Sequence, residues 1–129
     1  FFLVNSDTWI GASLVHFLKL KPPAMGVIFM HDTKRYGSIE FSQEKLVLSF
    51  KEKINSNNSG FINSGLYFMN SQLFDNWDGK PFSMEKKYLT KFAEQGILSA
   101  VDLKSSFIDI GIPQDYRYFR KNFTKIINE

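Results

Sequence analysis

Two short apolar runs near opposite ends of this chain each lead into an aspartate. Residues 1–4 lead through a small polar stretch to Asp7, and Phe107-Ile108 lead directly to Asp109. An apolar run that ends in small polar residues is typical of a buried parallel strand at its carboxyl end. Ligands of open α/β sheets bind outside such ends, so we expect two carboxylates that could hold a hard divalent cation against a phosphorylated substrate. The simpler alternative is that one aspartate caps a turn and the other caps a helix.

The remaining apolar segments alternate between strand-like and helix-like patterns. Strands are expected over residues 24–30, 38–41, 45–50, 61–69, 97–103 and 107–110. Helices are expected over residues 14–18, over 84–95 with Ser83 as the N-cap, and from Pro113 onward. This alternation predicts an α/β sheet in a single domain of 129 residues.

Composition excludes several kinds of site. The net charge of +3 comes from scattered lysines without a basic block, which argues against a nucleic-acid partner and is compatible with small phosphorylated ligands. The absence of cysteine rules out disulfides, thiolate nucleophiles and cysteine-ligated zinc, and it fits a reducing cytoplasm. Because no apolar stretch approaches the ~18 residues of a membrane span, we expect no membrane partner.

The first residues begin inside what should be a buried strand. The chain starts with Phe1 rather than Met, and a central strand needs neighbours on both sides. We therefore expect either a missing upstream segment or a second copy of the chain to cover this strand.

Six segments in a fixed order carry a family resemblance. They are LVNSDT at 3–8, RYG at 35–37, FKEK at 50–53, INSGLY at 62–67, FSME at 82–85 and FIDIGIPQDY at 107–116. Together they resemble the sugar-1-phosphate nucleotidyltransferases, most closely the branch that acts on D-glycero-D-manno-heptose 1-phosphate with GTP. Each motif alone is weakly specific, but their order and spacing are family-like from residue 1 to about residue 123.

The resemblance implies a fold, a reaction and a metal. It implies a Rossmann-like α/β fold with a mixed, mostly parallel sheet flanked by helices, of which residues 1–129 are the carboxyl-terminal part of one domain. The family joins a sugar 1-phosphate to a nucleoside triphosphate and releases pyrophosphate. By this resemblance Asp7 and Asp109 hold Mg²⁺, Lys53 contacts the sugar phosphate, and these three residues form the catalytic set.

The same resemblance implies a sugar pocket that includes Tyr36, Gly37, Glu52, Asn63 and Gly65. Glu52 would accept hydrogen bonds from sugar hydroxyls, and Asn63 and Gly37 would line the pocket. Structural alternatives stay open for three of them. Glu52 neighbours Lys53 on a strand, so one of the two side chains could be solvated surface. Asn63 could cap a loop, and Tyr36 could pack beside a turn.

For Ser83 and Glu85, which match the family's FS-x-E motif, a helix cap and a first-turn acid are equally good explanations. The family's Gly-rich triphosphate loop does not occur in residues 1–129, so we expect this chain not to catalyse the transfer by itself.

The expected function is transfer of a nucleotide from a triphosphate, with GTP as the expected donor, to a heptose-type or mannose-type sugar 1-phosphate in the cytoplasm. The product would be a nucleotide sugar, such as a lipopolysaccharide or capsule precursor. One alternative is a metal-dependent glycosyltransferase, although no D-x-D motif is present. Another is a non-catalytic module that binds sugar phosphates or nucleotide sugars.

Overall fold

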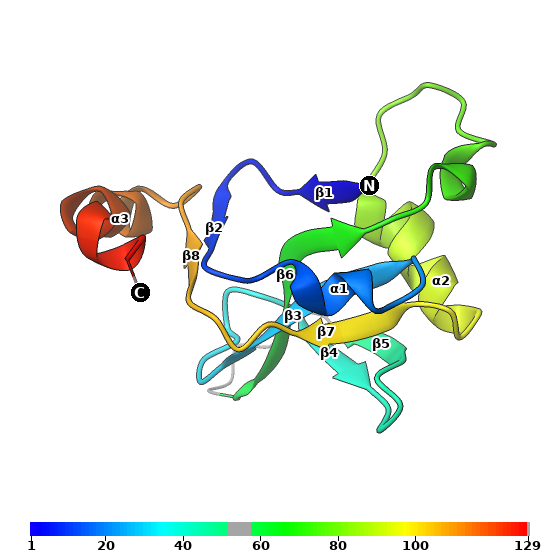
Figure 1. The fold of residues 1–129 in the computed structure, drawn as a ribbon, viewed down its shortest axis with the longest axis horizontal. Helices are drawn as coiled ribbons and strands as arrows, with labels where there is room; N and C mark the ends of the chain where they lie inside the picture. The colour runs from blue at the N-terminus through cyan, green and yellow to red at the C-terminus, as the bar shows by residue number, and fades with distance from the viewer. Residues whose placement is uncertain (52–57, 129) are drawn as a thin grey trace.

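Among the residues that the computed structural model describes, 1–51 and 58–128, six strands form one sheet (Figure 1). They are β1 (Phe2–Val4), β3 (Ala24–Met30), β4 (Ser38–Phe41), β5 (Val47–Lys51), β6 (Gly60–Phe68) and β7 (Ser99–Asp102). The main path of the sheet is β5-β4-β6-β3-β7, and β1 pairs with the far end of β6. Two further strands, β2 (Thr8–Ile10) and β8 (Phe107–Asp109), form a separate antiparallel pair.

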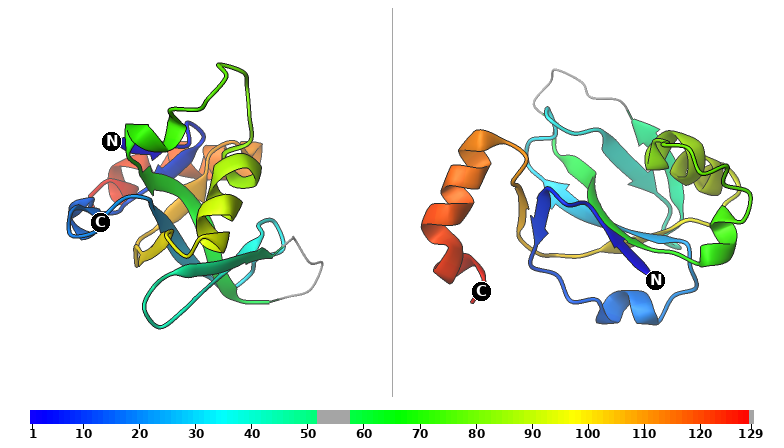
Figure 2. Two further views of the ribbon diagram at one scale, coloured as in Figure 1. Left: turned by 90° about the vertical axis from the view of Figure 1, so that its right-hand side faces the viewer. Right: turned by 90° about the horizontal axis from the view of Figure 1, so that it is seen from above.

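Helices lie on both faces of the main sheet (Figure 2). They are α1 (Val15–Leu18), the 3₁₀ turn η1 (Ser71–Phe74), the π-helical turn η2 (Glu85–Leu89), its continuation α2 (Thr90–Glu94), and α3 (Pro113–Ile126). No helix within the described ranges is both long and apolar enough to cross a membrane.

The two faces bury different side chains of the same strands, because successive residues of a strand point in opposite directions. Met25 and Val27 of β3 pack in one cluster with Leu89 at the end of η2. Ala24 of the same strand packs in a second cluster with Phe17 of α1. All five side chains are completely buried, so the core is continuous through the sheet.

The prediction of a mixed sheet with flanking helices is confirmed. The prediction that it is mostly parallel is wrong for the described residues, in which β3 and β7 form the one parallel pair. In particular, β1 runs antiparallel to β6, with Leu3 opposite Tyr67. An apolar run indicates burial but not strand direction, and this explains the error.

The carboxyl-terminal helix stands apart from the main sheet, beside β8 (Figures 1 and 2). It begins at Pro113, as the sequence predicts, and Ile126 is its one buried residue. Tyr116 and Phe123, which the helical pattern places on the buried side, are 45% and 47% exposed. Most of the helix is therefore exposed, and its contacts with the rest of the chain include that of Phe119 with Trp9, whose ring centroids lie 5.8 Å apart.

Candidate functional site

The pairing of β2 with β8 brings Asp7 and Asp109 together. Asp7 immediately precedes β2, Thr8 lies opposite Asp109, and the Gly111 N–H donates to the Asp7 carbonyl over 3.1 Å. A β-carbon on Gly111 would lie 3.1 Å from Asp7 Oδ2 and 3.2 Å from Asp109 Oδ1. The two carboxylate oxygens are thus no farther apart than the sum of these distances. The expected convergence occurs, but an antiparallel pair produces it rather than two parallel strand ends.

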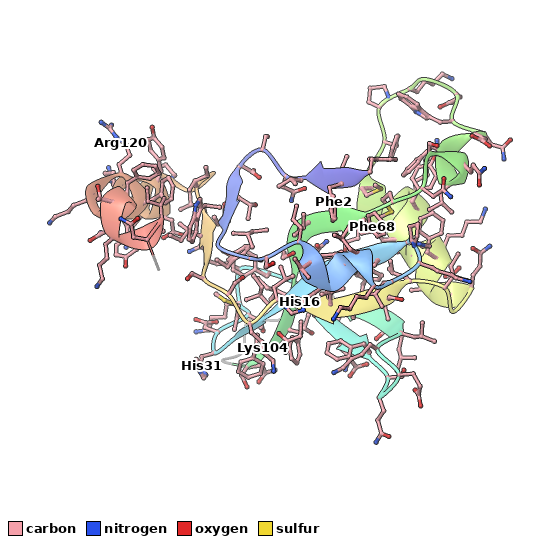
Figure 3. All side chains as sticks on the ribbon, in the orientation of Figure 1. Phe2, His16, His31, Phe68, Lys104 and Arg120 are labelled. Carbon is pink, nitrogen blue, oxygen red and sulfur yellow. The ribbon has the colours of Figure 1, made fainter. Side chains whose placement is uncertain are left out.

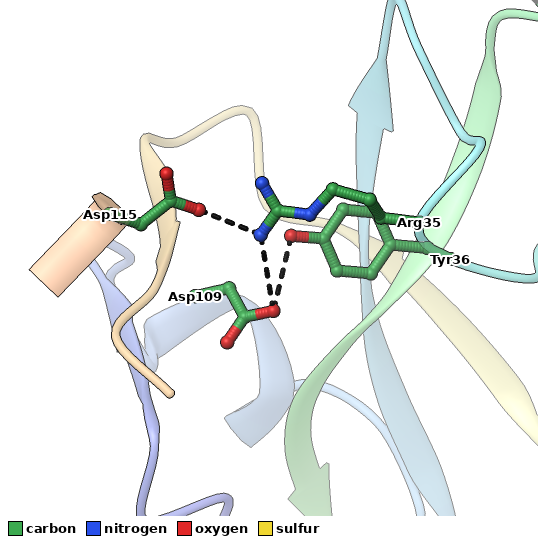
Figure 4. A network of polar contacts seen from close by, with 4 residues as sticks. All are labelled: Arg35, Tyr36, Asp109 and Asp115. Atoms are coloured by element: carbon green, nitrogen blue, oxygen red, sulfur yellow. Dashed lines mark hydrogen bonds and ion pairs between the residues drawn. The ribbon is translucent and has the colours of Figure 1, made fainter. Parts of the chain in front are cut away.

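The other oxygen of Asp109 belongs to a polar network that joins three parts of the chain (Figure 4). Arg35 Nη2 donates to Asp115 Oδ2 over 2.7 Å and to Asp109 Oδ2 over 3.4 Å. The Tyr36 hydroxyl also donates to Asp109 Oδ2, over 3.4 Å. Asp109 therefore uses one oxygen for Arg35 and Tyr36 and presents the other beside Gly111 and Asp7.

Charge and burial set the protonation of the two donors. Burial by itself lowers the pKa of Arg35, but the hydrogen bond to Asp115 and the surrounding negative charges outweigh it and raise the pKa above its ordinary value. Burial, reinforced by the charge of Asp109, raises the pKa of Tyr36 to about 12 against the opposing effect of Arg35. At neutral pH Arg35 is a cation and Tyr36 a neutral donor, as their contacts with a carboxylate require.

Arg35 and Tyr36 form a common wall of two neighbouring cavities. One cavity, of about 350 Å³, is also lined by Asp109 and Asp115. The other, of about 190 Å³, is also lined by Gly37, Ser38, Ile39, Lys51, Asn63 and Glu85. This places Asp109 and Asp115 next to a small cavity whose wall includes three of the predicted sugar-pocket residues, Tyr36, Gly37 and Asn63.

The side chain of Asn63 makes two hydrogen bonds within β6. Its Oδ1 accepts from the Gly65 N–H over 2.9 Å, and its Nδ2 donates to the Tyr67 hydroxyl over 2.9 Å. These bonds stabilise an irregular strand segment, at which the pairing with β3 shifts register. Asn63 thus has the structural role of the alternative interpretation while it also lines the small cavity.

Both predicted glycines are required by close approaches within the chain itself. Gly65 has a φ of +75°, and a β-carbon there would lie 2.5 Å from Asn5 Nδ2, which favours glycine on both counts. A β-carbon on Gly37 would lie 2.5 Å from the Lys51 carbonyl oxygen. The close neighbour of Gly37 is thus the backbone of β5, while Gly37 also lines the small cavity.

Two predicted residues, Glu52 and Lys53, lie outside the described residues. The cavity-lining residues that were not predicted as site residues include three charged ones, Arg35, Asp115 and Glu85. All three lie in the motifs that carry the family resemblance, and these motifs were the sequence signal that could have identified them as site residues. Glu85 begins the π-helical turn η2, and π-helical turns frequently occur at functional sites.

The donor set suits a magnesium ion shared with a substrate. Within the described ranges no group of three or more His, Cys, Asp or Glu side chains is arranged to hold a metal. Mg²⁺ is usually bound by one or two carboxylates and completed by water and substrate phosphates. Asp7 Oδ2 and Asp109 Oδ1, converging beside Gly111, fit that requirement.

Comparison with known proteins identifies the family. The family model described as "Nucleotidyl transferase" matches residues 1–125. The chain belongs to this nucleotidyltransferase family, and the resemblance seen in the sequence is confirmed.

Among its relatives, the chain is 32% identical over 124 residues to a D-glycero-alpha-D-manno-heptose 1-phosphate guanylyltransferase of Campylobacter jejuni, covering 94% of this chain and 55% of the relative. It is 31% identical over 121 residues to a mannose-1-phosphate guanylyltransferase catalytic subunit beta of Drosophila pseudoobscura, covering 90% of this chain and 33% of that protein.

The crystal structure of HddC from Yersinia pseudotuberculosis superimposes with a TM-score of 0.81 at 32% identity, covering 95% of this chain and 55% of that chain. The same protein has also been solved complexed with GMP-PN. The inositol-1-phosphate CTP transferase of T. maritima, at 17% identity and a TM-score of 0.73 over 100% of this chain and 56% of that one, shares the fold. The chain spans about half the length of HddC and of the heptose-phosphate relative, and about a third of the mannose-phosphate relative.

Proposed function

We propose that this chain carries the sugar-phosphate half of a sugar-1-phosphate nucleotidyltransferase site. The protein would join a heptose-type or mannose-type sugar 1-phosphate to GTP and release pyrophosphate, to give a nucleotide sugar of the kind used for lipopolysaccharide or capsule. The convergence of Asp7 and Asp109, with Asp109 in a cavity that shares the wall of Arg35 and Tyr36 with the small cavity, carries the proposal. The names of the relatives, which are guanylyltransferases for heptose and mannose phosphates, support the choice of sugar and base.

The reaction brings two negatively charged phosphate groups together, so the site must supply cations and hydrogen-bond donors that neutralise their charge. An oxygen of the sugar phosphate forms a bond to the α-phosphorus of the triphosphate, and the bond from that phosphorus to the bridging oxygen of the leaving pyrophosphate breaks. Such a step needs positioning and charge neutralisation more than a covalent nucleophile. Asp7 and Asp109 would hold Mg²⁺, which when bound neutralises phosphate charge and aligns the reacting groups.

Neighbouring residues would hold the carboxylates and the sugar. Arg35 and Tyr36 donate to Asp109 Oδ2 and so orient the carboxylate. The small cavity would take the sugar ring, with Asn63 and Gly37 in its wall and Gly65 supporting it from β6. Glu52 would accept hydrogen bonds from the sugar hydroxyls.

Lys53 would bind the phosphate of the sugar substrate as a point charge. Replacing Lys53 with Ala should therefore raise the KM for the sugar 1-phosphate more than the KM for the triphosphate. Steady-state kinetics with each substrate varied in turn measure this difference. An equal effect on both substrates would mean that Lys53 does not contact the sugar phosphate.

The family's Gly-rich loop does not occur in residues 1–129, and we propose that polypeptide outside these residues supplies the triphosphate cradle. Among the described residues, β1 pairs with β6 along one of its two edges, and Phe1 and Val4 are each 54% exposed. We propose that an upstream segment, or a second copy of this chain, covers the other edge of β1. A cytoplasmic location stays a prediction from the cysteine-free sequence.

Pyrophosphate release tests the function directly. The protein that contains this chain is incubated with Mg²⁺, GTP and either mannose 1-phosphate or D-glycero-D-manno-heptose 1-phosphate, with ATP, CTP, UTP and glucose 1-phosphate as controls. The proposal predicts release that requires both substrates and stops when EDTA removes the metal. Sugar-phosphate binding without any pyrophosphate release would instead identify a non-catalytic binding module.

A further inference from the structure

Asp115 contacts Arg35 more closely than Asp109 does, although Asp115 was not expected in the site. Its Oδ2 lies 2.7 Å from Arg35 Nη2, whereas Asp109 Oδ2 lies 3.4 Å from the same nitrogen (Figure 4). Asp115 belongs to the first turn of α3, and the side chains of Asp115 and Asp109 are 29% and 23% exposed. One guanidinium nitrogen is thus shared unequally between two carboxylates.

This unequal sharing bears on how Asp109 can bind a cation. A full ion pair with Arg35 would neutralise Asp109 and place a fixed positive charge beside any metal there, which opposes metal binding. Asp115 takes the shorter contact, so the guanidinium nitrogen of Arg35 lies closer to the carboxylate of α3 than to Asp109, whose contact with it is the longer one. The Oδ1 atom of Asp109 stays beside Gly111 and Asp7.

We propose that Asp115 is a positioning residue that holds the Arg35 guanidinium away from Asp109, so that Asp109 keeps its negative charge for a divalent cation shared with Asp7. The inference rests on the cation site of the proposed function. Without Asp115, the guanidinium moves fully onto Asp109 and competes with the cation. The start of α3 thereby controls the affinity of a site to which it contributes no ligand.

A purely structural role for Asp115 leads to a different expectation. An acidic residue in the first turn stabilises a helix through the positive end of its dipole, and any nearby carboxylate raises cation affinity through its charge. Neither effect depends on whether residue 35 is an arginine. The dependence of the Asp115 effect on Arg35 is therefore the observable that separates positioning from these roles.

A double-mutant cycle read by Mn²⁺ binding tests the proposal. Mn²⁺ prefers the same oxygen ligands as Mg²⁺, and free Mn²⁺ is measured by its electron paramagnetic resonance signal as metal is titrated into the protein. The variants are Asp115→Asn, Arg35→Gln and the two combined, with Asp75→Asn at the exposed end of η1 as a matched surface control. Circular dichroism checks that each variant is folded.

We expect Asp115→Asn to weaken Mn²⁺ binding at least about fivefold, since an unopposed unit charge then lies against the site. In the Arg35→Gln background the same substitution should change the affinity less than about twofold, because no guanidinium remains to compete. Asp115→Ser removes the charge but keeps a side chain suited to the start of a helix, so it should weaken Mn²⁺ binding as Asp115→Asn does. If Asp115→Asn is unfolded, Asp115→Ser takes its place in the cycle.

An equal loss of affinity with and without Arg35, or no loss at all, overturns the positioning role while leaving the cation site intact. The cation site has its own check in Asp7→Asn and Asp109→Asn. If these two variants bind Mn²⁺ as the parent chain does, the site proposed for the function fails and the role of Asp115 fails with it.

Discussion

The core of the main sheet and the arm formed by β2, β8 and α3 are built in opposite ways. In the core, Met25, Val27 and Leu89 are completely buried between strands and helices. In the arm, every residue of the three-residue strands β2 and β8 is only half-buried, and Arg35 forms an ion pair with Asp109 at the end of β8. The core determines the stability of the fold, whereas the arm presents the carboxylates.

The side chains show the same contrast (Figure 3). Phe2 and Phe68 lie stacked with ring centroids 5.0 Å apart where β1 meets β6. Arg120 instead projects from α3 on the far side of the arm, with its guanidinium carbon 5.8 Å from the Tyr116 ring. Substitutions in the core should therefore change stability, and substitutions in the arm should change ligand binding at nearly constant stability.

The largest change in stability should come from the core. Leu89→Ala removes a side chain that is 0% exposed and leaves a cavity between η2 and the sheet. The expected loss is about 2–5 kcal/mol in the free energy of unfolding, measured by urea denaturation at neutral pH. A loss of unfolding free energy smaller than that caused by a substitution at an exposed position, such as Lys91→Ala, would mean that the core does not determine the stability of the fold.

A substitution in the arm should show the reverse pattern. Gly111→Ala places a methyl group 3.1–3.2 Å from Asp7 Oδ2 and Asp109 Oδ1, in the space that a shared cation would need. We expect a change in unfolding free energy below about 1 kcal/mol, but a loss of Mn²⁺ affinity of at least about fivefold, since displaced ligands bind a small cation poorly. Gly60→Ala, where the added carbon would meet its nearest atoms at the ordinary contact distances of 3.6 and 3.8 Å, controls for a glycine substitution as such. Unchanged Mn²⁺ affinity in Gly111→Ala would contradict the site's location.

The smallest expected effect concerns Tyr36, at the junction of the two regions. Its folded pKa is raised to about 12, whereas an unfolded chain has the ordinary value of about 10. Above pH 10 the unfolded state loses this proton first, so the stability that comes from the neutral phenol is fully present below about pH 10 and lost by about pH 12. Because Tyr36 is only half-buried and solvent screens it, the loss should stay under about 1 kcal/mol.

The matched comparison is Tyr36→Phe. Tyr67, whose pKa burial also raises, titrates in both proteins and cancels from the difference. Urea denaturation at pH 9 and pH 11 should therefore show a smaller loss of stability in Tyr36→Phe than in the parent protein. Parallel pH profiles for the two proteins would show that Tyr36 does not titrate as its surroundings indicate.

The same contrast explains what could be predicted from the sequence. Apolar periodicity located β3, the β4–β5 hairpin, β6 and the helix after residue 83, because burial in a core leaves a local pattern. It did not reveal β2, since Thr8-Trp9-Ile10 is too short to carry a period and is a strand only because β8 pairs with it. The π-helical turn at Glu85 likewise has no local signal.

Within the site, the two aspartates were predictable and their setting was not. Asp7 and Asp109 each follow an apolar run, so each shows locally that it lies at a strand boundary. The bridge from Arg35 to Asp115 spans 80 positions of sequence, and nothing near either residue indicates the other. Only the packing of α3 against β8 brings them together, and such tertiary contacts have no single-sequence pattern.

Turnover of the aspartate variants tests the central claim most directly. In the protein that contains this chain, Asp7→Asn and Asp109→Asn should each reduce pyrophosphate release at saturating Mg²⁺ by at least about 10²-fold, because a metal clamp supplies several kcal/mol of transition-state stabilisation. The unfolding free energy should remain close to that of the parent protein, and Asp75→Asn should leave turnover unchanged. Near-parental turnover in both aspartate variants would contradict the assignment of Asp7 and Asp109 as the metal-binding pair.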